Sequence, residues 1–257
     1  MKPAANPGVN LARTVAPVVP ASFLSRKHLF HLFETGLPGV TVVAAPAGYG
    51  KSSLVSQWAE NSPLPTVWLS VDAADSTQTF FAHVLAAIQV KFPEFGSDFE
   101  NEPSANPLLN VKKLTGAAGD LNKAFNFVLD NGPADSPEVT SVAQALIDFL
   151  PNNVHLIIVR RMTPATSLAR YASLGNLSLI TSQDLRFSEQ EVSKVAELNG
   201  LQQLDANTLR LVDQCEGWPA AVQMITRSIA RGNQSSQFEI ESGSSPISVL
   251  ALETINS

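Results

Sequence analysis

The chain has little of several features that define common classes of protein. A single cysteine, Cys215, excludes a framework of intrachain disulfides and fits a reducing compartment, so we expect a cytoplasmic location. Only 16% of the 257 residues are charged, the net charge is −6, and no stretch is rich in lysine or arginine, which argues against direct binding of nucleic acid. No apolar run approaches the length of a membrane span, and the four histidines lack the spacing of metal ligands.

Composition divides the chain into four parts. Residues 1–19 are rich in proline, alanine and asparagine, and they predict a flexible arm. Residues 20–183 alternate strand-like and helix-like segments, whereas residues 184–232 are helical only. Residues 233–257 begin polar and rich in glycine and serine, which predicts a linker and the start of a further domain. With 44% apolar residues, the chain can bury one medium core and one small core.

Five apolar, β-branched segments predict strands, over residues 40–44, 66–69, 125–129, 155–159 and 176–180. Segments with helical spacing lie before and between them, over residues 23–33, 53–59, 80–88 and 139–150. Asp75 is the expected cap of the helix around residue 80, and residues 93–120 predict a loop with a short helix. This alternation indicates an α/β fold, a parallel sheet with helices on both faces.

The helical part carries its own boundary signals. Ser188 and Glu191 have the spacing of a capping box that opens a helix. A further helix is predicted over residues 204–215, Gly217 ends it, and Pro219 begins the next one. We therefore expect a small all-helical subdomain after the sheet.

The segment between the first strand and its helix is the most informative one. It has the layout of a phosphate-binding loop: strand, glycine-bearing loop, lysine, hydroxyl, helix. Gly48 and Gly50 allow the backbone to turn its N–H groups toward an anion, and the following helix adds the partial positive charge of its N-terminus. Lys51 would contact the β- and γ-phosphates, and the hydroxyl of Ser52 would ligate Mg²⁺.

One position of this loop departs from the strict pattern. Ala45 stands where the pattern has glycine, and its small side chain is compatible with the turn. The residues that we expect to bind phosphate are Ala47, Gly48, Tyr49, Gly50, Lys51, Ser52 and Ser53.

Two residues at the end of the third predicted strand address catalysis. Asp130 can hold a Mg²⁺-bound water, although an aspartate in an ordinary turn would look the same. ATPases of this type usually place a second carboxylate next, which orients or deprotonates the attacking water. Here that residue is Asn131, which can hydrogen-bond to water but cannot accept a proton. We expect slow hydrolysis or none.

Two further side chains have two interpretations each. Arg161, at the end of the fourth predicted strand, could sense the γ-phosphate or could be a surface arginine paired with a carboxylate. Trp218 could belong to a core or could cover a nucleotide base.

The motifs, taken in order, resemble the nucleotide-binding region of MalT-like, LuxR-type transcription regulators. These belong to the signal-transduction ATPases with numerous domains (STAND). The segments that carry the resemblance are SRKHL, APAGYGKSSLVSQWA, VWLSVDAADSTQTFFAHVLAAI, FVLDN, LPNNVHLIIVRRMTP, DLRFSEQE and EGWPAAVQ. They lie between residues 19 and 231.

The resemblance implies a three-layer P-loop NTPase with a five-stranded parallel sheet whose loop strand is central, followed by a small helical subdomain. It implies ATP or ADP and Mg²⁺ as ligands, with Ser52 and Asp130 on the metal. It further implies that Arg26 and Pro219 contact the nucleotide and that Arg161 is the sensor arginine. Self-association on activation is also implied, with DNA bound only through domains outside this chain.

Two departures from the family's pattern bear on turnover. Asn131, Gly132 and Pro133 replace the Asp-Tyr-His that usually follows the first acid, and Arg160 replaces a serine.

Three functions therefore stay open. The first is an ATP-binding switch module of a transcription regulator with slow or absent hydrolysis. The second is a working ATPase, in which another acid such as Glu138 or Asp135 replaces Asn131. The third is an interaction scaffold that no longer depends on nucleotide.

Overall fold

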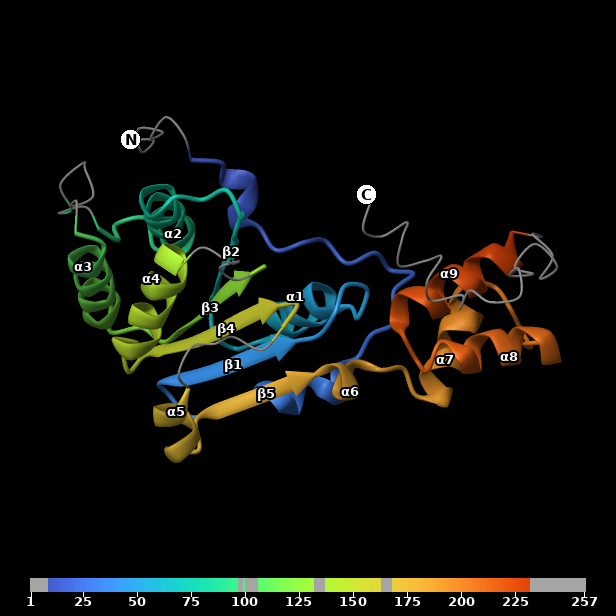
Figure 1. The fold of residues 1–257 in the computed structure, drawn as a ribbon. Helices are drawn as coiled ribbons and strands as arrows, with labels where there is room; N and C mark the ends of the chain where they lie inside the picture. Colours follow the sequence, from blue (N-terminus) through green and yellow to red (C-terminus); the bar gives the residue numbers. More distant parts are fainter. Residues whose placement is uncertain (1–8, 97–98, 100–105, 132–136, 163–167, 232–257) are drawn as a thin grey trace.

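The computed structural model describes residues 9–96, 99, 106–131, 137–162 and 168–231 (Figure 1). A five-stranded, all-parallel sheet forms its centre, in the order β2-β3-β4-β1-β5. The strands are β1 (Gly39–Ala44), β2 (Thr66–Ser70), β3 (Phe125–Asp130), β4 (Val154–Arg160) and β5 (Leu177–Thr181). Each matches a predicted strand to within one residue at either end. The loop strand β1 is interior, but the central strand is β4, because only β5 lies beyond β1.

Helices cover both faces of the sheet, which confirms the predicted three-layer α/β class. The helices and 3-10 helices before β5 are η1 (Leu11–Thr14), η2 (Lys27–Phe33), α1 (Lys51–Asn61), α2 (Thr77–Lys91), α3 (Pro107–Asp120), α4 (Pro137–Asp148) and α5 (Ala169–Ser173). Alternate residues of a strand point to opposite faces. Val42 accordingly packs in the cluster that includes α2, α3 and α4, and Val43 packs in the cluster that includes α1 and η2.

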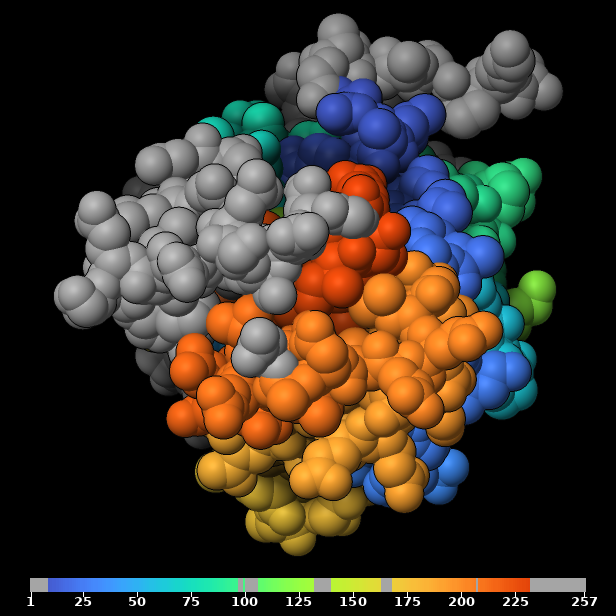
Figure 2. Space-filling view, turned by 90° about the vertical axis from the view of Figure 1, so that its right-hand side faces the viewer, coloured from blue at the N-terminus to red at the C-terminus, as the bar shows by residue number. Residues whose placement is uncertain are grey.

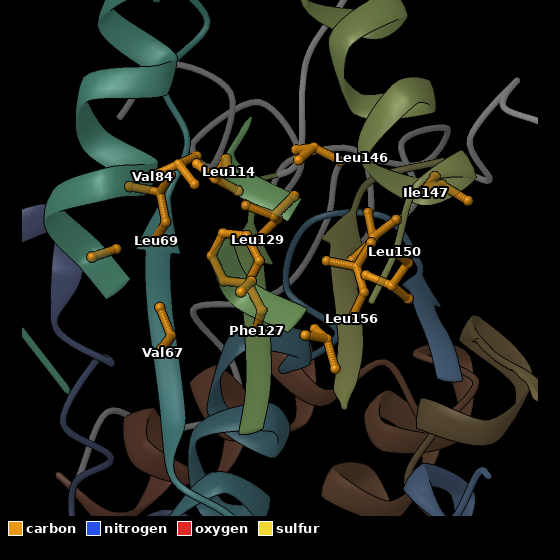
Figure 3. Close-up of a cluster of buried hydrophobic side chains, with 14 of the residues drawn as sticks. Val67, Leu69, Val84, Leu114, Phe127, Leu129, Leu146, Ile147, Leu150 and Leu156 are labelled. Carbon is orange, nitrogen blue, oxygen red and sulfur yellow. The ribbon is translucent and has the colours of Figure 1, made fainter. Parts of the chain in front are cut away.

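The larger core lies between the sheet and helices α2, α3 and α4 (Figure 3). Leu69, Phe127 and Leu156 project from three neighbouring strands toward Val84 of α2 and Leu146 of α4 (Figure 3). All five side chains are buried. Burial on this scale is the main favourable contribution to folding, at about 25 cal/mol per Å² of apolar surface. It holds the strand ends in the positions that the site requires.

Helix α3 differs from the sequence-based expectation of a loop with a short helix. It has 14 residues, begins after the cap Asn106, and buries Val111 and Leu114. Gly116 and Gly119 lower its intrinsic helix propensity, and they make the helical spacing of its apolar residues hard to recognise in the sequence. Burial of one face against the core outweighs that cost.

The N-terminal segment also differs from expectation. Residues 9–19 lie against the sheet instead of forming a flexible arm. Arg13 donates from Nε to the carbonyl of Ser70 (2.7 Å), at the end of β2, and forms an ion pair with Asp75. Asp75 is therefore used for this pairing, and Ser76 caps α2 by accepting the N–H of Thr79. The guanidinium of an arginine has five N–H donors, so Arg13 can bond to several acceptors at once. The proline-rich composition of the segment gives no sign of these contacts.

A helical subdomain lies beyond the carboxyl ends of the strands (Figure 1). After the short α6 (Ser182–Leu185), it comprises α7 (Glu189–Leu198), α8 (Ala206–Gln214) and α9 (Pro219–Ala230). The predicted capping box of Ser188 and Glu191 is present at the start of α7. Gly217, between α8 and α9, has φ +73°, and a Cβ there would lie 2.5 Å from the carbonyl oxygen of Phe187. This turn therefore requires glycine.

The described helices include none with the length and apolar character needed to cross a membrane.

Candidate functional site

The predicted phosphate loop connects β1 to α1 at the carboxyl edge of the sheet. Gly48 (φ +77°) and Gly50 (φ +72°) both adopt the left-handed conformation that glycine permits, and Gly50 is the N-cap of α1. A Cβ on Gly50 would meet no atom within 4 Å, so the space beside this residue is open. Ala45 is buried and is not among the residues with positive φ, so the pattern's glycine is not required there. Tyr49 packs against the cluster beneath α1.

Lys51 and Ser52 begin α1, directly after the two glycines. The first N–H groups of a helix have no acceptor within it, so those of Lys51, Ser52 and Ser53 are available to an anion. The ammonium of Lys51 donates to the carbonyl of Pro46 (2.9 Å). The hydroxyl of Ser52 donates to Oδ1 of Asp130 (2.8 Å), which joins the loop to the end of β3. The structure thus brings together the two residues predicted to hold the metal.

The charges around Lys51 favour an anion. Burial lowers the pKa of Lys51, Asp130 raises it, and the nearby positive charge of Arg161 lowers it again. Burial raises the pKa of Asp130, while bonds from Ser52 and from the N–H of Asn131, and the charge of Lys51, oppose that rise. Lys51 therefore has one anion, Asp130, and a second cation, Arg161, in its surroundings, and a bound phosphate would reduce the repulsion between the two cations.

Asn131 is exposed and has φ 56°. Its backbone N–H donates to Oδ1 of Asp130 (3.0 Å), so the residue turns away immediately after the strand. Asparagine is one of the few residues other than glycine that tolerate this conformation. Of the two alternative acids, Asp135 lies outside the described residues, and the side chain of Glu138 is not described either.

Arg161 lies at the same edge, one residue after β4. It is exposed, and among the described residues no carboxylate is within salt-bridge distance of it. The alternative of a paired surface arginine is therefore not supported within that part of the chain. Nε of the neighbouring Arg160 is buried and has no hydrogen-bond partner among the described residues.

The first turn of α9 contacts the outside of the phosphate loop. The indole N–H of Trp218 donates to the carbonyl of Ala47 (3.2 Å), and the N–H of Ala220 donates to the carbonyl of Gly48 (3.0 Å). Pro219, between them, is buried at the first position of the helix. The EGWP segment signalled this region in the sequence, but no sequence pattern assigned Trp218 or Ala220 to the loop.

Arg26, predicted to contact the nucleotide, bonds to the helical subdomain in this structure. Its guanidinium forms a nearly buried ion pair with Glu191 (Nε to Oε1, 2.7 Å) and donates to the carbonyls of Leu185 and Arg186. It also lies over the ring of Phe187. All three nitrogens therefore donate to the helical subdomain, in four hydrogen bonds of the five that a guanidinium can donate. These bonds connect the helical subdomain to the N-terminal segment.

Metal binding is compatible with the site's donors. A hydroxyl and a carboxylate are the hard oxygen ligands that Mg²⁺ prefers, and Ser52 and Asp130 already lie within hydrogen-bond distance. Elsewhere in the described residues, no group of three or more His, Cys, Asp or Glu side chains could hold a metal ion.

Comparison with curated proteins confirms the resemblance that the motifs predict. The chain is 27% identical over 205 residues to the HTH-type transcriptional regulator MalT of Klebsiella pneumoniae, and 29% identical over 210 residues to MalT of Yersinia pestis. Each match covers 77% of this chain and 23% of the regulator, so the chain spans about a quarter of the length of these relatives. No model of a protein family matches the chain.

Two solved structures share this fold. A STAND protein with a tetratricopeptide repeat sensor from Pyrococcus horikoshii has a TM-score of 0.56 and 16% identity, over 79% of this chain and 29% of that one. Cdc6p from Pyrobaculum aerophilum has a TM-score of 0.56 and 12% identity, over 89% of this chain and 66% of that one. At such identities the similarity establishes the fold alone.

Proposed function

We propose that this chain is an ATP-binding switch module of a signal-responsive transcription regulator, with slow or absent hydrolysis. The main observation behind the proposal is the contact between the predicted phosphate loop and the end of β3. Lys51 and Ser52 stand at the N-terminus of α1, and the Ser52 hydroxyl lies 2.8 Å from the Asp130 carboxylate. Together they provide a cation, free amides and two metal ligands at one point. The similarity to MalT regulators supports the regulatory role.

The proposed ligands are ATP or ADP with Mg²⁺. The amides from Ala47 to Ser53 would bind the phosphates, Lys51 would neutralise their charge, and Arg161 would approach the γ-phosphate from the end of β4. Mg²⁺, when bound, would balance further phosphate charge. Pro219 would contact the nucleotide, as the resemblance to MalT-like regulators implies.

Slow turnover follows from Asn131. Its amide can orient a water molecule, but it cannot remove the proton that an attacking water must lose. The module would then bind nucleotide and self-associate without rapid hydrolysis. We propose homo-oligomerisation on activation as the readout, and we assign no DNA contact to this chain.

Equilibrium binding and turnover together test the proposal. Binding of fluorescent ATP and ADP analogues would be measured by anisotropy with and without Mg²⁺, and phosphate release would be followed under single-turnover conditions. Binding at micromolar concentration, strengthened by Mg²⁺, with little or no phosphate release, is expected. Rapid release would instead favour a working ATPase that uses another acid. Absence of nucleotide binding would favour the scaffold.

A further inference from the structure

Trp218 occupies two environments at once. Its ring packs against the apolar cluster of the helical subdomain, whereas its indole N–H reaches the carbonyl of Ala47 in the phosphate loop, 3.2 Å away. The side chain thus extends from the core of one part of the molecule to the backbone of the other. Neither a purely structural role in the helical core nor coverage of a base explains a bond to this loop.

A second bond joins the same two parts. The N–H of Ala220 is in the first turn of α9, where no acceptor exists within the helix. The carbonyl of Gly48 accepts it at 3.0 Å. The fit is close, because a Cβ on Gly48 would lie 2.7 Å from both Cβ of Ala220 and Nε1 of Trp218. Position 48 thus requires glycine for two reasons: the neighbouring side chains leave no space for a Cβ, and the backbone has a φ of +77°.

These two bonds act on the peptide groups that form the phosphate cradle. In a trans peptide the C=O and N–H groups point in opposite directions. The carbonyls of Ala47 and Gly48 are held toward α9, so the N–H groups of Gly48 and Tyr49 in the same peptides must point away from it. The outside of the loop is therefore fixed by α9, and two amides are oriented before any ligand arrives.

We propose that Trp218 is a positioning residue for nucleotide binding. Its indole N–H, together with the amide of Ala220, holds the phosphate loop in its binding conformation from the outside. Loop and helical subdomain are then coupled, and nucleotide must favour the docked position of α9 as strongly as docking favours nucleotide. The inference rests on the proposed function, because it assumes that the loop binds phosphate.

The variant Trp218→Phe tests this role, since it keeps an aromatic ring in the helical core and removes the N–H. Loss of one such bond is expected to weaken binding of an ADP analogue with Mg²⁺ by about tenfold. Trp68→Phe is the matched control. Trp68 is also buried and also loses an indole bond, to Ser70 (3.2 Å), but β3 and β4 separate its strand from β1. Its nucleotide affinity should stay within twofold of the wild type.

A second measurement does not depend on a substitution. Amide hydrogen exchange of Ala220 in the wild-type chain is expected to slow at least several-fold when ADP and Mg²⁺ are added, together with exchange of the Trp218 indole proton. Thermal unfolding of both tryptophan variants shows whether each is folded at the temperature of the assay. Should Trp218→Phe not fold, the exchange measurement decides.

Lys51→Ala separates the inference from the proposed function. If Lys51→Ala loses binding while Trp218→Phe binds like the wild type, or if nucleotide leaves the exchange of Ala220 unchanged, the positioning role is wrong and the nucleotide site stands. If Lys51→Ala binds nucleotide like the wild type, the proposed site itself is wrong.

Discussion

The two ends of the parallel sheet differ in what their polar side chains bond to. At the amino end, the side-chain amide of Asn126 donates to Oγ of Ser62 (2.8 Å) and Oγ1 of Thr66 (3.1 Å). On the neighbouring strands, Oγ1 of Thr41 lies 2.8 Å from Nε2 of His155. These bonds link α1 and the strands to one another, and Asn126 and His155 are both almost completely buried.

At the carboxyl ends of β1, β3 and β4, by contrast, charged side chains are not fully paired with one another. Lys51 donates to a backbone carbonyl, and within the described residues no carboxylate forms a salt bridge with it. Arg161 is exposed, and Asp130 is buried with its pKa raised by that burial. Buried polar groups that satisfy one another support the fold, whereas charged groups held together without full pairing mark a site. Substitutions at the two ends should therefore affect different properties.

The largest effect is expected from Lys51→Ala at the carboxyl end. Removal of the ammonium should weaken nucleotide binding by about 100-fold or more, because the phosphates lose a charge-assisted bond. The free energy of unfolding should change by less than about 1 kcal/mol. Anisotropy titration and urea denaturation measure the two quantities. Lys194→Ala, at an exposed position on α7, is the control and should change neither.

The converse substitution is Asn126→Ala at the amino end. It removes the donor that Ser62 and Thr66 share and leaves a cavity at a buried position, so the free energy of unfolding should fall by about 2 to 3 kcal/mol. Nucleotide affinity of the folded protein should stay within twofold of the wild type. Asn61→Ala, which removes an exposed asparagine at the end of α1, should have little effect on either. A large loss of affinity in Asn126→Ala would contradict the division between the two ends.

A pH dependence should also originate at the amino end. Burial lowers the pKa of His155 from 6.5 to about 4. Between these values the unfolded chain binds a proton that the folded chain does not, so this contribution to stability is complete above pH 6.5 and is lost as the pH falls toward 4. From pH 7 to pH 5 the loss should be about 2 kcal/mol. Urea denaturation at both pH values measures it, and the loss should be smaller in His155→Gln. An equal pH dependence in that variant would assign the effect to other groups.

The smallest effect is expected from Asn131→Asp. The new carboxylate supplies the missing proton acceptor, and phosphate release should rise by about tenfold. A larger gain is not expected, because Gly132 and Pro133 also depart from the family's pattern. Asn122→Asp is the matched control, since Asn122 also has positive φ (48°) and precedes the amino end of β3. An unchanged rate in Asn131→Asp would show that other departures limit hydrolysis.

Much of the fold could be predicted because its signals are local. Each strand is a short apolar run, and Ser188 with Glu191 forms a capping box whose spacing is visible in the sequence. The exceptions depended on distant partners. Asp75 is of a residue type that commonly caps helices, but its side chain pairs with Arg13, 62 positions earlier. Helix α3 is stabilised by a buried face that its glycines obscured.

The site shows the same limit. Arg26 was assigned to the nucleotide by resemblance, yet its guanidinium is bonded to Glu191, 165 positions away. Trp218 had two interpretations, and its indole N–H contacts the loop, which neither of them included. No spacing rule predicts such pairs, because they form only when segments far apart in the chain come together in the folded molecule.

The sequence by itself determined the phosphate loop and the parallel sheet, since glycine conformation, helix polarity and apolar periodicity act over a few neighbouring residues. Only the tertiary structure decided how the helical subdomain lies on that loop and which charged side chains form ion pairs within the fold. Those outcomes depend on hydrogen bonds and ion pairs between residues far apart in the chain, and their energies exist only once the core has brought the partners together.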